Sequence, residues 1–372
     1  MSRDSADRSP PRQHIQYSAT QPVEALVEPM EETEIARIPG PSGLEPGAIV
    51  GNYRLIRRLG SGAMSVVFEA EHLRTRQRTA LKCLRPHLTR DRRAARRFLG
   101  DAVAAANVGH DGVARVFDWA DDFDGVAYIA TEYLEGETLA TRLDRCGSLR
   151  TREALSIARQ LAETLSAVHA VGIVHRDLKP DNVYLLGEPS TPGSVQVKLI
   201  DFGVAKFCSP HIKLSMNTAM GVILGTPCYM SPEQGRGQSD VDARSDVYSL
   251  GCILYHMLCG IPPFRGTVGE LLVAHQFHQP RAPRTIDPRL PEALDRLIVQ
   301  MLGKDPDARP PTMVAVAESL DQIRGCRGPS TPGRRTRSRS RIGKPLLTLL
   351  LCTLVVLVSA AAAHTAGVMG LL

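Results

Sequence analysis

The chain has 372 residues, of which 43% are hydrophobic, 23% charged and 5% aromatic. This apolar fraction excludes a wholly disordered protein, and the length suffices for one large domain or two modest ones with a buried core. The net charge of +6 is local, because residues 324–344 hold eight basic side chains and no acidic one, which leaves −2 for the rest. The composition therefore gives no support for a nucleic-acid-binding body, and nucleic acid is not expected as a partner.

Eight cysteines are scattered without a Cys-x-x-Cys pair. This pattern excludes a disulfide-stapled mini-domain and a finger-type zinc site, and it suits a reducing compartment. Residues 1–13 contain no apolar run, so no cleaved signal peptide is expected. Residues 1–50 are rich in Pro, Ser, Glu and Gly and predict a disordered arm, in which only 23–35 favours a short helix.

Regular hydrophobic patterns begin at Tyr53 and continue to residue 323. Alternating apolar residues predict strands over 53–59, 64–71, 78–84, 113–119 and 126–132. Residues 91–108 predict an amphipathic helix with Phe98, Val103 and Ala106 facing inward, and further helices are expected over 151–171, 244–259, 291–302 and 311–323. A β-rich half followed by a helical half predicts an α+β protein of two lobes.

Two further segments close the chain. Residues 324–345 lack apolar content and predict a basic flexible linker. Residues 346–363 carry no charge, and the apolar run continues to about residue 368, which is long enough to cross the hydrocarbon core of a bilayer. A buried C-terminal helix is the alternative, but such a helix shows a polar face. We therefore expect a transmembrane helix over 346–368, with its basic flank on the cytoplasmic side.

A glycine-rich turn between the first two of these predicted strands is the first candidate site. It comprises Leu59, Gly60, Ser61, Gly62, Ala63, Met64, Ser65, Val66 and Val67. Glycine lets backbone N–H groups approach phosphate closely, although a turn of this kind is more often a plain hairpin. Lys82 follows twenty residues beyond Gly62 on the third predicted strand, where it can pair with phosphate oxygens.

The most specific string is His-Arg-Asp-Leu-Lys-Pro-Asp-Asn at residues 175–182. The carboxylate of Asp177 can accept the proton of a substrate hydroxyl, and the amide of Asn182 can hold a metal. A second metal-binding carboxylate, Asp201, begins an Asp-Phe-Gly triplet at the end of a predicted strand. Thirty residues further on, Ser231-Pro232-Glu233 closes the segment. An ordinary charged loop is an improbable source of these motifs in this order.

Together these motifs resemble the signature set of the protein kinase family, and in particular the bacterial eukaryotic-type Ser/Thr kinases, over residues 53–323. Lys179, and Gly-Thr-Pro at 225–227, resemble the Ser/Thr rather than the Tyr branch. The resemblance implies a two-lobed kinase fold with a β-rich N-terminal lobe and a helical C-terminal lobe. It also implies that Asp246 braces the catalytic loop and that Arg309 pairs with Glu233.

The resemblance further assigns chemical roles. Lys82 would hold the α- and β-phosphates of ATP, Asp177 would orient and deprotonate the acceptor hydroxyl, and Lys179 would balance charge on the transferred phosphoryl group. Asn182 and Asp201 would bind Mg²⁺, or Mn²⁺ in its place, through oxygen. The residues expected around the adenine are Val67, Ala80, Glu132, Leu134 and Tyr184, with Thr131 as a small gatekeeper.

Two positions depart from the family pattern. Ser65 replaces the third glycine of the turn, which restricts the tip of the loop. Asp101 stands where the family has the glutamate that pairs with Lys82, so its side chain is one methylene short. The second departure points toward reduced activity.

The function implied is ATP- and Mg²⁺-dependent phosphorylation of protein Ser/Thr hydroxyls by a membrane-tethered, autophosphorylating kinase at the inner membrane, with a cytoplasmic kinase domain. A nucleotide-binding pseudokinase scaffold is the alternative. A small-molecule phosphotransferase is disfavoured, since it has no need of the segment 225–233. Arg176 is expected to anchor a phosphate on Ser215 or Thr218. Ser359, Ala363 and Gly367 would let the membrane helices of two copies approach, as a homodimer.

Overall fold

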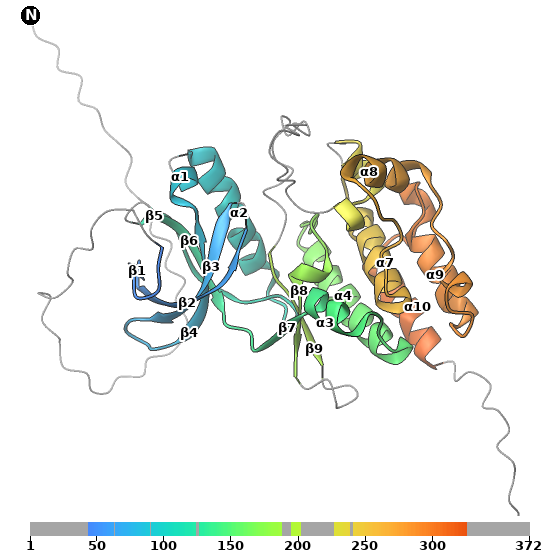
Figure 1. The fold of residues 1–372 in the computed structure, drawn as a ribbon, viewed down its shortest axis with the longest axis horizontal. Helices are drawn as coiled ribbons and strands as arrows, with labels where there is room; N and C mark the ends of the chain where they lie inside the picture. Colours follow the sequence, from blue (N-terminus) through green and yellow to red (C-terminus); the bar gives the residue numbers. More distant parts are fainter. Residues whose placement is uncertain are drawn as a thin grey trace, which may run out of the picture. The chain divides into compact units, whose positions relative to one another are not determined.

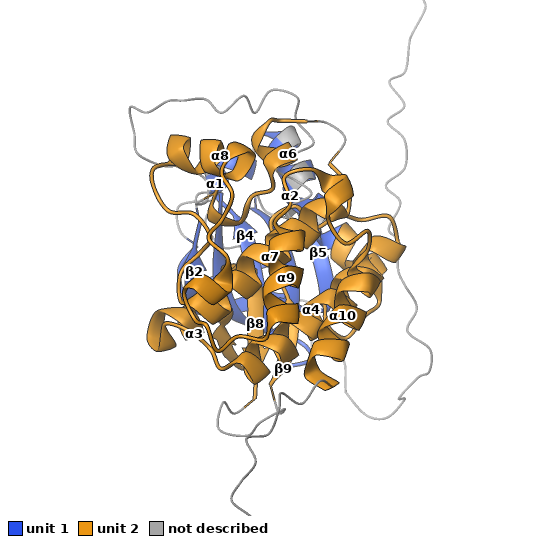
Figure 2. Ribbon diagram, turned by 90° about the vertical axis from the view of Figure 1, so that its right-hand side faces the viewer, with its two compact units in different colours: residues 1–103, 115–133 blue, residues 104–114, 134–372 orange. Residues whose placement is uncertain are grey.

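The computed structural model describes residues 44–62, 64–89, 91–123, 126–187, 195–201, 227–238 and 241–325. These residues form two compact units, shown in different colours in Figure 2. Unit 1 contains residues up to 103 together with 115–133, and unit 2 contains 104–114 together with the chain from 134 onward. Unit 1 is built mainly from strands and unit 2 mainly from helices, which confirms the predicted two-lobed α+β class (Figure 1).

Unit 1 is organised around an antiparallel sheet in the order β1-β2-β3-β4-β6-β5. Its strands are β1 (Ile49–Val50), β2 (Tyr53–Ser61), β3 (Ser65–His72), β4 (Arg78–Leu84), β5 (Val116–Phe123) and β6 (Val126–Glu132). Helix α1 (Pro86–Thr89) and helix α2 (Arg92–Val108) follow β4. The alternation of apolar residues along β3 and β4 sends Phe68 and Leu81 into the core, where each is 1% exposed or less.

The predicted inward face of α2 is only partly correct. Phe98 is buried, as expected, but Val103 is 44% exposed and Ala106 is also exposed. The side chains that share the core with Phe98 are Ala95 and Ala102, three residues before it and four after. Helical neighbours on one face are three or four residues apart, whereas Val103 is five residues from Phe98 and points away.

Two boundaries also differ from the sequence expectations. Residues 44–50 do not belong to the predicted arm, because β1 pairs with β2 and Val50 is buried. The predicted strand 113–119 begins only at Val116, since Val113 instead forms a parallel bridge with Leu199 in unit 2. In both places a backbone partner distant in sequence decides the structure, and local alternation does not reveal it.

Unit 2 begins with β7 (Gly136–Thr138), α3 (Leu139–Cys146) and α4 (Thr151–Ala170). A 3₁₀ turn, η1 (Pro180–Asn182), leads into β8 (Val183–Leu186) and β9 (Gln196–Leu199), and the three strands form a sheet in the order β7-β8-β9. The remaining elements are η2 (Pro227–Tyr229), α6 (Pro232–Gly235), α7 (Arg244–Cys259), α8 (Val268–Phe277), η3 (Pro283–Thr285), α9 (Glu292–Met301), η4 (Pro306–Ala308) and α10 (Met313–Gly325).

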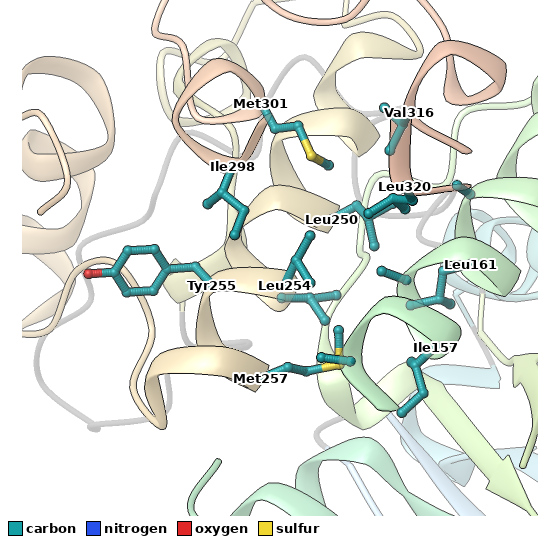
Figure 3. Close-up of a cluster of buried hydrophobic side chains, with 14 of the residues drawn as sticks. Ile157, Leu161, Leu250, Leu254, Tyr255, Met257, Ile298, Met301, Val316 and Leu320 are labelled. Carbon is teal, nitrogen blue, oxygen red and sulfur yellow. The ribbon is translucent and has the colours of Figure 1, made fainter. Parts of the chain in front are cut away.

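The core of unit 2 lies around α7, whose sequence is apolar on nearly every side, as expected for a buried helix (Figure 3). Leu250 and Leu254 of α7 are fully buried, as are Leu161 of α4 and Leu320 of α10. Each buried leucine stabilises the fold by about 1.5–3 kcal/mol. Gly251 allows α9 to approach closely, since a Cβ atom there would lie 2.9 Å from the Cβ of Met301.

Several predicted segments lie outside the described residues. These are the arm up to residue 43, most of the linker 324–345 and the expected transmembrane helix 346–368. Within the described ranges, no helix combines the length and the apolar character needed to cross a membrane. The predicted linker begins slightly later than residue 324, because α10 ends at Gly325.

Candidate active site

The glycine-rich turn of unit 1 joins β2 to β3. Gly60 lies opposite Val67 and Ser61 opposite Val66, and the N–H of Gly62 donates to the carbonyl oxygen of Ser65 at 2.8 Å. Leu59 is 40% exposed at the end of β2, Met64 is partly buried against the α2 core, and Ala63 lies outside the described residues. A Cβ atom on Gly60 would meet nothing within 4 Å, so packing does not explain the glycine. The open space leaves room for a ligand to approach the backbone, as the sequence predicts.

Arg85 holds this turn, a role that no sequence motif indicates. Its guanidinium donates to the carbonyl oxygen of Gly62 at 2.9 and 3.1 Å and to the hydroxyl of Ser61 at 2.8 Å. The backbone N–H of Arg85 also donates to the carbonyl oxygen of Met64 at 2.9 Å. These bonds occupy the carbonyl oxygens of Gly62 and Met64, so Arg85 holds the turn without using the N–H groups of the turn. The position of Arg85 directly after β4 is the sequence feature that could have indicated this role.

Lys82 lies in the middle of β4, directly opposite Val67 on β3 and Ile129 on β6. Directly opposite residues share one face of a sheet, so Lys82 lies on the same face as Val67. Ala80 shares this face because it is two residues from Lys82. The Nζ atom of Lys82 is 5.9 Å from the centre of the Phe98 ring on α2.

The expected partner of Lys82 is also on α2. Asp101 belongs to this helix, one turn beyond Phe98, but its side chain is not among those that the structure describes. The pairing of Asp101 with Lys82 therefore stays a prediction. Thr131, the expected gatekeeper, lies opposite Ala80, and its hydroxyl donates to the carbonyl oxygen of Ala80 at 3.3 Å. Glu132 ends β6, and its carboxylate accepts from the N–H of Arg115 at 2.7 Å.

A buried carboxylate in unit 2 holds the backbone of the motif at residues 175–182. Asp246 on α7 is 0% exposed and accepts from the N–H of His175 at 2.8 Å and from the N–H of Arg176 at 3.0 Å. His169 contributes a third contact at 2.8 Å through Nε2. The predicted bracing role of Asp246 is confirmed. It stabilises Arg176 at a φ of 64°, a left-handed conformation that is unusual outside glycine.

His175 is fully buried beneath the same loop. Burial lowers the pKa of its imidazole despite the nearby carboxylates of Asp246, Asp177 and Asp201, so the ring is neutral at physiological pH. A neutral ring can accept a hydrogen bond at Nδ1, and the N–H of Asp177 lies 3.3 Å from that atom. The histidine thus fixes the backbone from which the Asp177 side chain projects.

Asp177, Lys179, Asn182 and Asp201 come together at this loop. The Nζ atom of Lys179 is 3.2 Å from Oδ2 of Asp177. The side-chain amide of Asn182 donates to the backbone oxygen of Asp177 at 2.8 Å, to its Oδ2 at 3.2 Å and to the backbone oxygen of Asp201 at 3.5 Å. Residues from the loop, η1 and the end of β9 are thereby joined, as the sequence predicts.

The donor set of this cluster suits a hard divalent cation. The amide nitrogen of Asn182 is engaged by Asp177, which leaves its Oδ1 as the atom able to coordinate a metal. Asp201 is exposed and adds a carboxylate. Oxygen ligands of this kind, completed by water and substrate phosphates, fit Mg²⁺. The described residues contain no group of three or more His, Cys, Asp or Glu side chains that could form a separate all-protein metal site.

Tyr184 and Leu134, the remaining predicted adenine contacts, lie in unit 2. Tyr184 is on β8, opposite Thr138 of β7 and Lys198 of β9. Its neighbours Val183 and Leu185 are buried in the core of unit 2, so Tyr184 lies on the other face of the sheet. Leu134 is partly buried. Their contact with adenine stays a prediction.

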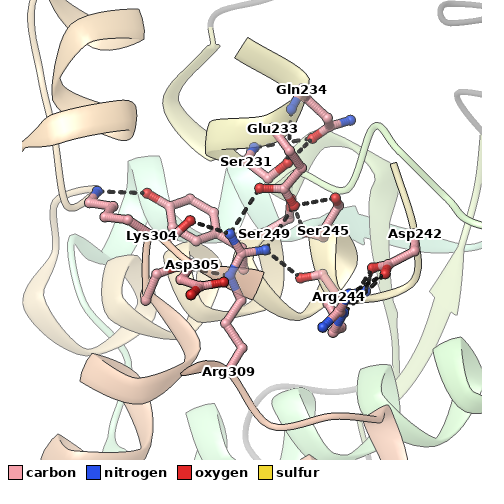
Figure 4. A network of polar contacts seen from close by, with 12 residues as sticks. Ser231, Glu233, Gln234, Asp242, Arg244, Ser245, Ser249, Lys304, Asp305 and Arg309 are labelled. Atoms are coloured by element: carbon pink, nitrogen blue, oxygen red, sulfur yellow. Dashed lines mark hydrogen bonds and ion pairs between the residues drawn. The ribbon is translucent and has the colours of Figure 1, made fainter. Parts of the chain in front are cut away.

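A second buried network secures the segment after residue 226 (Figure 4). The guanidinium of Arg309 binds Glu233 through two hydrogen bonds, Nη1–Oε1 at 2.8 Å and Nη2–Oε2 at 2.9 Å. This confirms the predicted pair. Ser245 donates a further bond to Glu233, and Gln234 donates to the carbonyl oxygen of Arg176 at 2.7 Å. The bonds of Ser245 and Gln234 link residues far apart in sequence and were not predicted.

A sheet-rich unit with a glycine turn and a strand lysine, joined to a helical unit with an aspartate–lysine–asparagine loop, defines the protein kinase fold. The family model for the protein kinase domain matches residues 53–320. The chain therefore belongs to the protein kinase family.

Individual relatives support the same assignment. Serine/threonine-protein kinase Pkn1 of Myxococcus xanthus is 38% identical over 74% of this chain and 38% of its own length. Serine/threonine-protein kinase PknA of Mycobacterium tuberculosis is 36% identical over 76% of this chain and 64% of its own length. The crystal structure of the M. tuberculosis PknI kinase domain aligns with a TM-score of 0.60 and 28% identity, covering 76% of this chain and all of that domain. The chain spans about two fifths of the length of Pkn1 and of a similar Streptomyces coelicolor relative.

Proposed function

We propose that this chain is a protein kinase that transfers the γ-phosphoryl group of ATP to Ser or Thr hydroxyls of proteins. The observation that carries this proposal is the cluster in which the Asp177 carboxylate lies within ion-pairing distance of Lys179 and within hydrogen-bonding distance of Asn182. Phosphoryl transfer requires a positioned base, a cation for the transferred group and a metal ligand, and this cluster contains one of each. The names of the relatives support Ser/Thr as the acceptor.

In the proposed reaction, Asp177 accepts the proton of the acceptor hydroxyl. The hydroxyl oxygen forms a bond to the γ-phosphorus as the bond from that phosphorus to the β-phosphate oxygen breaks, and ADP leaves. Lys179 stabilises the negative charge on the transferred group, since its Nζ lies beside the carboxylate that orients the nucleophile. His175 and Asp246 act as positioning residues, because they hold the loop backbone and touch no reacting atom.

Nucleotide binding is proposed for the face of unit 1 that carries Val67, Ala80 and Lys82. The two small apolar residues offer a surface for adenine, and Lys82 offers a charge for the α- and β-phosphates. Asn182 and Asp201 would hold Mg²⁺, which neutralises phosphate charge when it is bound. Glu132 and Leu134 flank the segment whose backbone is proposed to read the adenine edge.

Control by phosphorylation is a further part of the proposal. Nε of Arg176 is buried and has no hydrogen-bond partner among the described residues. A phosphate on Ser215 or Thr218 would supply one, through a charge-assisted bond. Autophosphorylation of that segment is proposed as the activating event. The apolar run 346–368 would anchor the kinase in the inner membrane, with the catalytic part on the cytoplasmic side where ATP is available.

One observation favours the pseudokinase alternative. Asp101 is too short by one methylene to take the place of the usual glutamate without an adjustment of α2. In that alternative the chain binds nucleotide and partners without transferring phosphate. A measurement of phosphoryl transfer distinguishes the active kinase from the pseudokinase.

The test compares the Asp177→Asn variant with the wild-type chain, using labelled ATP and Mg²⁺ and mapping phosphorylated residues by mass spectrometry. Loss of one positioned base lowers the transfer rate by about 10²–10⁴-fold while nucleotide binding stays intact. Asp181→Asn is the matched control, because Asp181 is an exposed aspartate of the same segment. Transfer at the wild-type rate in Asp177→Asn would refute the mechanism, and no transfer by the wild-type chain would favour the pseudokinase.

A further inference from the structure

Five arginines gather on unit 1 at the end of the sheet where β3 turns into β4. We call them the arginine cluster: Arg54, Arg57, Arg74, Arg76 and Arg78. Arg54 and Arg57 lie on β2, Arg78 begins β4, and Arg74 and Arg76 belong to the turn between β3 and β4. All five are exposed. None of them has a role in the phosphoryl transfer proposed above.

The strand register places the cluster on one face of the sheet. Glu71 on β3 lies opposite Arg54 on β2 and opposite Arg78 on β4, and Glu69 lies opposite Arg57. Residues directly opposite one another, and residues two apart on a strand, share a face. Arg54, Arg57 and Arg78 therefore lie together, around Glu69 and Glu71.

The two glutamates do not neutralise this surface. Glu69 pairs with Arg57 at 2.7 Å and with Arg78 at 2.9 Å, and Glu71 pairs with Arg76 at 2.6 Å. The side chains of Arg54 and Arg74 form no ion pair with the rest of the described chain, and the cluster keeps an excess of three positive charges. The surface therefore offers at least two guanidinium groups to an acidic partner.

Part of the cluster is held rigidly, which lowers the entropy lost when a partner binds. A nitrogen of Arg57 donates to the hydroxyl of Tyr133 at 2.9 Å, and the guanidinium of Arg78 stacks 4.2 Å from the centre of the same ring. Their shared contact with Glu69 lowers the pKa of that carboxyl below its ordinary value, although burial of the group acts in the other direction. The glutamate therefore stays charged and keeps both arginines in place.

A segment of complementary charge precedes unit 1 in the same chain. Residues 23–36 contain five glutamates, at positions 24, 28, 31, 32 and 34, and no lysine or arginine. Val23, Leu26, Val27 and Met30 lie between them and supply apolar contacts. Residues 326–344, which also lie outside the described residues, are basic and carry charge of the same sign as the arginine cluster.

The chain enters unit 1 close to the arginine cluster, so the acidic segment is tethered near it. The N–H of Gly47 donates to the carbonyl oxygen of Leu55 at 2.7 Å, and Leu55 is the neighbour of Arg54 on β2. Glu34 and Leu44, the first described residue, are ten positions apart, and such a stretch reaches up to about 33 Å. The acidic segment can therefore reach the cluster without strain.

We propose that residues 23–36 dock on the arginine cluster of the same chain. Each exposed ion pair contributes little by itself, but the tether raises the effective concentration of the segment to the millimolar range. Docking is electrostatic and therefore weakens as salt rises. The proposal does not depend on phosphoryl transfer, so it stands or fails separately from the kinase mechanism.

The test is millisecond hydrogen exchange of the full-length chain, read over residues 20–38. The wild-type chain is compared with Arg54→Glu/Arg74→Glu, with Glu28→Arg/Glu31→Arg, and with the combination of all four changes. We expect either charge reversal to speed exchange about three- to tenfold, and the combination to restore slow exchange. At ~1 M salt the wild-type chain should exchange like the single reversals.

Two controls keep the outcome clear. Arg281→Glu/Arg284→Glu changes two exposed arginines of unit 2 and should leave exchange of residues 20–38 unchanged. Arg54→Gln/Arg74→Gln removes the charges without repulsion from Glu71 and should also speed exchange, if more weakly. Equal exchange in wild-type and all variants would overturn the proposal. Fast exchange of residues 20–38 in the wild-type chain, together with slower exchange over residues 54–78 on addition of phosphatidylserine vesicles, would overturn it as well, because the cluster would then serve a lipid surface.

Discussion

Removal of one charge from the Glu233–Arg309 pair should destabilise unit 2 strongly. The side chain of Arg309 is 0% exposed and that of Glu233 is 6% exposed, so neither charge has access to water. In Glu233→Gln, Arg309 keeps its hydrogen bonds to the carbonyl oxygens of Gly303 and Arg244, but its charge loses its counterion. Breaking a buried pair in this way costs about 3–5 kcal/mol. Because Arg309 retains these bonds, we expect a loss of unfolding free energy near the lower end of that range, about 3 kcal/mol. This loss corresponds to a melting temperature lower by about 6–12 °C.

The assay is thermal and urea unfolding followed by far-UV circular dichroism, which reports on the helices of unit 2. Fluorescence is less suitable because the single tryptophan, Trp119, lies in unit 1. Glu292→Gln is the matched control, since the Glu292–Arg296 pair on α9 is 66% and 67% exposed and should contribute about 0.5 kcal/mol or less. A loss below about 1 kcal/mol in Glu233→Gln would refute the argument from burial.

The same pair predicts a dependence on pH. Burial of Glu233 raises its pKa, but the hydrogen bonds and charge of Arg309 outweigh this and hold the folded-state pKa below the ordinary glutamate value. A lowered folded-state pKa means that the pair contributes its full stability above the ordinary glutamate pKa and loses it as the pH falls through the folded-state value. The stability difference between the wild-type chain and Glu233→Gln should therefore narrow under acid conditions. A difference that is constant with pH would contradict the assignment of the charge.

Three further predictions concern the proposed function. If Asp101 pairs with Lys82, Asp101→Ala should lower the phosphoryl-transfer rate and Asp101→Glu should leave it unchanged or raise it; no effect of alanine in a kinase assay would exclude the pairing. If phosphorylation near Arg176 activates the enzyme, a Ser215→Ala/Thr218→Ala chain should phosphorylate an added protein more slowly than wild type, whereas undiminished activity would contradict this control. If residues 346–368 span a bilayer, the full-length protein should sediment with membranes and resist a high-salt wash, while a chain of residues 1–344 should be soluble and active; release by salt would show that only the basic segment holds it.

Short-range patterns in the sequence predicted much of the fold. The alternation in β3 and β4 could be recognised within a few residues, because side-chain direction repeats every 2.0 residues along a strand, and the apolar run of α7 predicted a buried helix. The same range sufficed for Asp177, Lys179 and Asn182, since they occupy one loop and the adjoining 3₁₀ turn. The family resemblance added the partners of Asp246 and Arg309, which lie about 70 residues or more from their contacts.

The tertiary structure decided the features that depend on distant backbone. The inward face of α2 is set by which strands it covers, so Ala102 and not Val103 is buried beside Phe98. The clamp of Arg85 on the glycine turn also follows from the packing of elements, because it requires β4 to end beside the β2–β3 turn. The neutral state of His175 requires its complete burial above Asp246, and sequence spacing carries no information on desolvation. Motifs therefore identified the groups proposed to react, whereas the surroundings that hold and tune them are properties of the folded chain.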